Sequence, residues 1–189
     1  MVCVRKGKKC CCSFFVVEDN NAIVPGECDV GDLRALFSYF QYRAPNIDSL
    51  SSPILDEGAH QKTLELMLKK NSLFAFCAHN LKTEDELVKL NLSGNVLCSQ
   101  CKRFLCKRSG HNSKRVPTRK ETDLECLLRH LRNAIAHGHV YIIHGGNHIS
   151  ALFEDRNSDK RITARIICCQ ADLRKWRCIL ESAVQGQRI

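Results

Sequence analysis

The sequence predicts a mainly α-helical bundle with a small antiparallel β-meander inserted before its last helix. Several segments carry apolar residues at helical spacing behind capping residues, and near the C-terminus the pattern changes to short extended runs separated by turn residues. The chain has 189 residues, of which 44% are hydrophobic and 26% charged. We therefore expect one globular domain over residues 1–189, with residues 1–27 as an N-terminal extension of uncertain structure.

The first expected helix follows that extension, in which SFFVV and AIVPG are interpreted as short extended pieces. Asp29 is interpreted as the N-cap of a helix in GDLRALFSYFQYR, and Pro45 ends it. Its apolar residues share one face: Leu33, Leu36, Phe37 and Phe40.

More helices are expected before residue 110. Ser52 and Pro53 are a start signal for the helix ILDEGAHQKTLELMLKK, and LFAFCAHN is expected to continue as helix or a close neighbour. Thr83 caps TEDELVKLNL, which has acids in its first turn. The run VLCSQCKRFLCKR is favoured as an amphipathic helix that buries Leu97, Cys101, Phe104 and Leu105.

The same run offers an alternative, because Cys98, Cys101, Cys106 and His111 have the spacing C-x2-C-x4-C-x4-H. This resembles a zinc knuckle with its last two ligand types exchanged, and such a knuckle would have to break the helix. We favour the helix and predict no metal or other cofactor.

A capping box, Thr122 with Glu125, opens the next helix, and Gly138 is its expected stop. Its apolar stripe consists of Leu124, Leu127, Leu128, Leu131 and Ile135. HVYIIH, NHISALFED and RITARIICC are then expected to be strands, with turns at Gly145–Gly146 and at residues 157–159. The last helix, ADLRKWRCILESAV, directs Leu173, Trp176, Ile179 and Leu180 inward.

The net charge of +9 favours a polyanionic partner. The positive charge is concentrated in residues 102–120, which contain no acidic residue. Residues 110–119 of this segment are expected to form a basic loop. The predicted RNA-backbone contacts there are Lys107, Arg108, Lys114, Arg115, Arg119 and Lys120. Without a recognisable secretion signal or a long apolar run, we expect a cytoplasmic protein, whose thirteen cysteines are then reduced.

The helix at residues 122–137 carries a polar patch opposite its apolar stripe. At about 100° per residue, Arg129, Arg132, Asn133, Ala136 and His137 fall on that side. A guanidinium binds phosphate, an imidazole transfers protons near neutral pH, and the amide can orient either group. Because RNA supplies its own nucleophile, the 2′-hydroxyl, these groups are sufficient for cleavage by transesterification without a metal.

The motif Arg132-Asn133-Ala134-Ile135-Ala136-His137 resembles that of the HEPN superfamily, in which an arginine and a polar residue precede a histidine late on an amphipathic helix. The glycine, the extended segments and the last helix are similar to bacterial defence, plasmid and toxin branches of that superfamily. The resemblance implies a helical bundle and a metal-independent endoribonuclease that leaves 2′,3′-cyclic phosphate and 5′-hydroxyl ends.

The resemblance also implies roles. Arg132 binds the phosphate, His137 is the general acid and base, and Asn133 orients it; we add Arg129 and His139 as RNA-binding residues. The other nearby histidines, His130, His144 and His148, are interpreted as surface or turn residues.

The expected partners are RNA and a second copy of the chain. One helix end offers one imidazole, so two copies paired through this helix would supply a base and an acid. We also expect a separate antitoxin or regulatory protein, and no membrane. Two alternatives stay open: a non-catalytic HEPN module that binds RNA, nucleotide or a protein, and a helical structural subunit whose motif is a coincidence.

Overall fold

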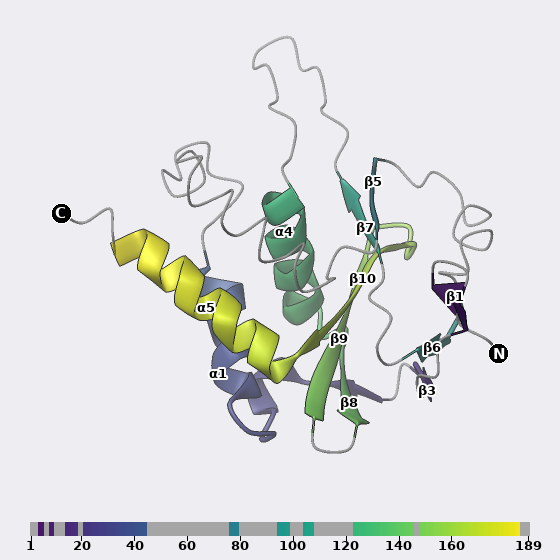
Figure 1. The fold of residues 1–189 in the computed structure, drawn as a ribbon, viewed down its shortest axis with the longest axis horizontal. Helices are drawn as coiled ribbons and strands as arrows, with labels where there is room; N and C mark the ends of the chain where they lie inside the picture. Colours follow the sequence, from purple (N-terminus) through teal and green to yellow (C-terminus); the bar gives the residue numbers. More distant parts are fainter. Residues whose placement is uncertain are drawn as a thin grey trace, which may run out of the picture.

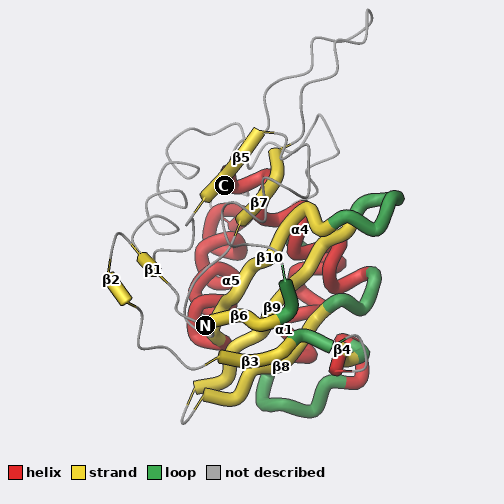
Figure 2. The backbone as a smooth tube through the Cα atoms, turned by 90° about the vertical axis from the view of Figure 1, so that its right-hand side faces the viewer, coloured by secondary structure: helices red, strands yellow, loops and turns green. Residues whose placement is uncertain are grey.

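A computed structural model of the chain describes residues 4–5, 8–9, 14–18, 21–44, 76–79, 94–98, 104–107, 123–145 and 148–185. In this part of the chain a six-stranded sheet forms the centre, and α-helices pack on one of its faces (Figure 1; Figure 2). The elements are β1 (Val4–Arg5), β2 (Lys8–Lys9), β3 (Phe14–Val16), β4 (Ala22–Ile23), the 3₁₀ turn η2 (Pro25–Glu27), α1 (Leu33–Ser38), the π-helix η3 (Tyr39–Arg43), β5 (Phe76–His79), β6 (Val96–Cys98), β7 (Phe104–Lys107), α4 (Asp123–Ala136), β8 (Val140–Gly145), β9 (His148–Arg156), β10 (Ile162–Cys169) and α5 (Gln170–Gln185).

The sheet has the strand order β4-β8-β9-β10-β7-β5. All neighbours are antiparallel except β5 and β7, which run parallel. The predicted meander is confirmed as β8, β9 and β10. Asn157 builds its second turn as predicted, because Asn157 Oδ1 accepts hydrogen bonds from the backbone N–H groups of Asp159 (3.1 Å) and Arg161 (2.9 Å).

The main core lies between the helices and the face of the sheet that they cover. Side chains alternate along a strand, so Ala151 and Phe153 of β9 and Ala164 and Ile166 of β10 belong to this core. The predicted apolar faces are confirmed by burial: Leu33, Leu36, Phe37 and Phe40; Leu124, Leu127, Leu128, Leu131 and Ile135; Leu173, Trp176 and Leu180.

The opposite face of the sheet carries a smaller apolar cluster, in which Val17 covers Tyr141, Ile143, Leu152 and Ile167. Figure 2 shows β3 and β6 on this side, in front of the sheet. A buried ion pair adjoins the cluster. Arg165 Nε donates to Glu154 Oε2 at 2.8 Å, and Arg165 Nη1 donates to the Gly94 carbonyl at 2.6 Å. The two side chains are only 1% and 0% exposed, respectively.

The predicted fold class is wrong, because the described part of the chain is a sheet with helices on one face and not a helical bundle with a small β insert. LFAFCAHN, predicted as helical, contains β5, and VLCSQCKRFLCKR, favoured as an amphipathic helix, contains β6 and β7. Short apolar runs of this length are compatible with a helix or a strand. Here β7 forms hydrogen bonds with the edge of β10, and this tertiary pairing favours the strand.

The first predicted helix is correct in place but differs in form. Its α-helical part begins at Leu33, after the N-cap Asp32 and not after Asp29, and the chain continues as a π-helix to Arg43. The predicted helices at residues 54–70 and 83–92 and the basic loop at residues 110–119 lie outside the described residues.

Candidate active site

The candidate site lies at the C-terminal end of α4, where the chain reverses into β8. Gly138 has φ +70° and ends the helix, as its sequence position predicts. The N–H of His139 donates to the Ala134 carbonyl at 2.9 Å, and that of Gly138 donates to Ile135 at 3.2 Å. These are the two bonds of a Schellman motif, which satisfies the free carbonyls of the last turn.

This helix end brings two histidines together. His137 is exposed on the last turn, and His139 follows the left-handed glycine, so that their ring centroids lie 6.3 Å apart with the rings tilted by 35°. The carbonyl of His139 accepts a hydrogen bond from the Glu154 N–H at 3.0 Å, which fixes its backbone to β9. Nδ1 of His139 is buried and has no hydrogen-bond partner among the described residues.

The arginine of the motif connects α4 to the end of η3. Arg132 is half-buried, and its Nη2 donates to the Ala44 carbonyl at 2.8 Å. A guanidinium carries five N–H donors, so it can bind a structural carbonyl and a phosphate oxygen at the same time.

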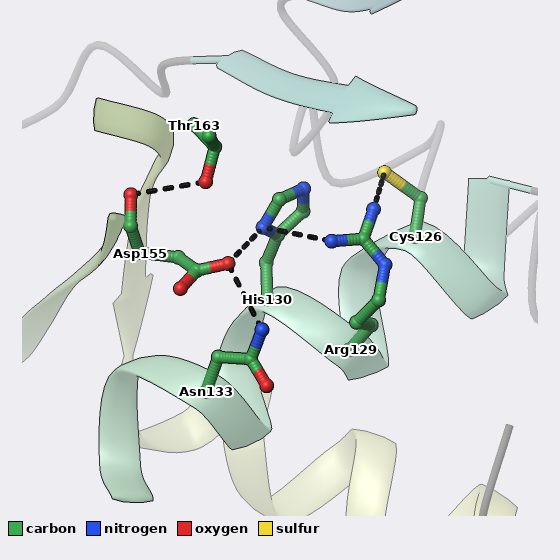
Figure 3. A network of polar contacts seen from close by, with 6 residues as sticks. All are labelled: Cys126, Arg129, His130, Asn133, Asp155 and Thr163. Atoms are coloured by element: carbon green, nitrogen blue, oxygen red, sulfur yellow. Dashed lines mark hydrogen bonds and ion pairs between the residues drawn. The ribbon is translucent and has the colours of Figure 1, made fainter. Parts of the chain in front are cut away.

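Asn133 is part of a buried polar network (Figure 3). Its Nδ2 donates to Asp155 Oδ2 at 3.2 Å, and His130 Nδ1 donates to the same oxygen at 2.6 Å. Burial raises the pKa of Asp155, but the interactions with His130, Asn133 and Arg129 lower it by more. The pKa of Asp155 therefore lies below its usual value. Asp155 is therefore held as a carboxylate inside the protein.

Two predicted assignments change in this network. The sequence predicts that Arg129 binds RNA, but the residue is buried, with Nη1 at 3.5 Å from His130 Nδ1 and Nη2 at 3.9 Å from Cys126 Sγ. The sequence predicts that His130 is a surface or turn residue, but it is only 1% exposed. The sequence shows only that His130 lies one helical turn before Asn133; its burial follows from the contact of this side of α4 with β9.

The remaining predicted RNA-binding residues are placed only in part. Lys107 ends β7, whereas Arg108, Lys114, Arg115, Arg119 and Lys120 lie outside the described residues. Of the four possible zinc ligands, Cys98 lies in β6 and Cys106 in β7. Cys101 and His111 lie outside the described residues. No group of three or more metal-binding side chains occurs among the residues that the structure describes.

Residues 60–181 match the family HEPN pEK499 p136, and this match covers more than half of the chain. The chain belongs to the HEPN family. The match spans α4 and the whole meander, so it includes the Arg132-Asn133 and His137 motif on the helix and the strand that carries Asp155.

HEPN domains are typically ribonucleases, and membership places this chain in a nuclease- and toxin-like class of modules. Searches of curated proteins and of solved structures found no match. Among the helices that the structure describes in this HEPN protein, none combines the length and apolar character needed to cross a bilayer.

Proposed function

We propose that this HEPN protein is a metal-independent endoribonuclease that cleaves RNA by transesterification. The observation that carries the proposal is the family motif at an open helix end, with His137 exposed and Arg132 and Asn133 half-buried beside it. The ribose 2′-oxygen attacks phosphorus and the bond to the 5′-oxygen breaks. The products are a 2′,3′-cyclic phosphate and a 5′-hydroxyl.

Arg132, His137 and the neighbouring His139 have roles in this reaction. One proton leaves the 2′-hydroxyl and another reaches the departing 5′-oxygen, and His137 is the imidazole that transfers protons. Arg132 stabilises the charge that builds on the phosphate oxygens. His139, whose ring centroid is 6.3 Å from that of His137, is an auxiliary that contacts the same phosphodiester.

We further propose that two copies pair through the motif helix and that the basic segment at residues 102–120 approaches the RNA backbone. In a cytoplasmic toxin or phage-defence effector, a separate antitoxin would restrain the activity. A monomeric variant that kept full cleavage activity would remove the dimer from this proposal.

The decisive experiment is a cleavage assay in EDTA with end-labelled tRNA and mRNA. Wild type is expected to leave cyclic phosphates, and His137→Ala is expected to leave the RNA intact. His148→Ala is a matched control, because His148 is an exposed histidine on β9 at the far end of the meander. Growth arrest on expression that His137→Ala relieves would support the toxin role.

A second candidate is a non-catalytic HEPN module that binds RNA, nucleotide or a protein. It is favoured by the contacts of the polar helix face with the chain itself, since Arg132 binds the Ala44 carbonyl and Arg129 is buried. RNA binding without cleavage, unchanged by His137→Ala, would select this candidate.

A further inference from the structure

The carboxylate of Asp155 lies inside the protein, yet it contacts the nuclease motif directly. It stands one residue before the end of β9 and is 3% exposed. One oxygen, Oδ2, accepts hydrogen bonds from His130 and Asn133, which lie one helical turn apart on α4 (Figure 3). A buried carboxylate forms charge-assisted hydrogen bonds, so this one oxygen holds both side chains in place.

The strand backbone is adapted to this contact. The register of β10 against β9 shifts between Ile162 and Ala164, so that Thr163 is an extra residue opposite Asp155. Thr163 Oγ1 donates to the Asp155 carbonyl at 3.2 Å. Bulges of this kind redirect a side chain, often next to an active site.

The contact fixes which way the Asn133 amide faces. A carboxylate only accepts hydrogen bonds, so the NH₂ group of Asn133 must face Asp155. The amide oxygen then points away from Asp155, as Figure 3 shows. Asn133 is half-buried, so this oxygen is an acceptor at the rim of the site, where a substrate hydroxyl can donate to it in place of water.

We propose that Asp155 is a positioning residue of the HEPN site, which holds the Asn133 amide so that its oxygen accepts a hydrogen bond from the ribose 2′-hydroxyl. This inference rests on the proposed function. The 2′-hydroxyl is the donor that distinguishes RNA from DNA and is also the nucleophile. Asp155 thereby acts on the reaction through Asn133 and touches no reacting atom.

The test exchanges the carboxylate and the amide between the two positions. Asp155→Asn is expected to lower kcat by about 10²-fold with little change in KM, the size expected for a misplaced group in a site. Asn133→Asp alone brings two carboxylates together and lowers kcat at least as far. The double variant Asn133→Asp/Asp155→Asn restores a donor facing an acceptor and is expected to recover about 10-fold over Asn133→Asp.

The neighbouring Glu154 supplies a control, because it is also a buried carboxylate on β9 but pairs with Arg165 on the opposite face of the sheet. Glu154→Gln changes only the side chain and keeps the backbone N–H that bonds His139, so it is expected to lower stability and leave kcat of the folded protein unchanged. A folded Asp155→Asn protein with wild-type kcat would overturn the inference. So would a double variant no more active than Asn133→Asp.

A binding measurement separates this inference from the cleavage proposal. The affinity for a ribo-oligonucleotide is compared with that for its 2′-deoxy counterpart. Wild type that does not cleave but prefers the ribo-oligonucleotide would refute the cleavage proposal. If Asp155→Asn then loses this preference, Asp155 is still shown to position Asn133 for ribose recognition. Wild type without any ribose preference, or a preference that Asp155→Asn keeps, overturns it.

Discussion

Replacing Gly138 with alanine tests whether the helix end is a constrained part of the site. Gly138 has φ +70°, and a Cβ added there would meet no atom within 4 Å. The substitution therefore introduces no steric clash, and its cost is the backbone conformation alone. A left-handed conformation costs an L-residue about 1–2 kcal/mol, and the stiffer unfolded chain of the alanine variant offsets about 0.4–1 kcal/mol of this.

The expected net loss in the free energy of unfolding is thus about 1 kcal/mol for Gly138→Ala. For a chain of this size, that corresponds to a decrease in Tm of about 2–4 °C. In urea, with an m-value of about 2 kcal/mol/M, the midpoint falls by about 0.5 M. Thermal melts and urea titrations of the purified variants measure both shifts.

Gly26→Ala is the matched control. Gly26 also has no atom within 4 Å of an added Cβ, but its φ is not in the left-handed region. We expect it to leave stability unchanged or to raise it by up to about 1 kcal/mol. Gly138→Asn should lose less than Gly138→Ala, because asparagine tolerates the left-handed region. Equal stability of the two alanine variants would refute the argument that Gly138 constrains this helix end.

Three further predictions concern titratable groups. The pKa of Asp155 is lowered in the folded protein, so its contribution to stability is present above pH 3.8 and is lost as the pH falls through the folded pKa. The free energies of unfolding of wild type and Asp155→Asn should therefore become equal in acid. Burial, with Glu181 nearby, raises the pKa of Tyr39 to about 12, so ultraviolet titration should show a tyrosine near that pH that Tyr39→Phe lacks, and stability should fall as pH rises from 10.0 toward 12. His139→Gln should lower kcat by about 10²-fold, at the lower end for the loss of one contact to the charged transition state, and unchanged kcat would exclude His139 from the reaction.

The elements predicted correctly from the sequence are those with local signals. The sequence of α4 has the capping-box residues Thr122 and Glu125, a continuous apolar stripe and the stop residue Gly138, and all of these signals lie within one segment. The meander has extended runs and turn residues close together in the chain. Strands β5 and β7 lack such signals, because β7 pairs with β10, about 60 residues later in the chain, and β5 pairs in turn with β7.

The residues of the candidate site also differ in whether the sequence alone reveals them. Arg132, Asn133 and His137 are recognisable because they lie within six residues on one helix. Asp155 lies 22 residues after Asn133, on a strand, and an aspartate near the end of a strand looks like an ordinary surface residue in the sequence. Its importance depends on a tertiary contact, and so does the burial of Arg129, which the helical pattern alone places on the polar side.

The sheet therefore changes what the motif helix can present to RNA or to a second copy of the chain. In a simple bundle, the whole polar face of α4 would be open. Here Arg132 binds the end of η3 and Asn133 binds β9, while Ala136 and His137 stay exposed at the helix end. A partner that reaches His137 must approach this end, where the Schellman motif and the Glu154–His139 backbone bond fix the chain. The helix carries the motif, and its contacts with η3 and with β9 limit how much of the motif is accessible.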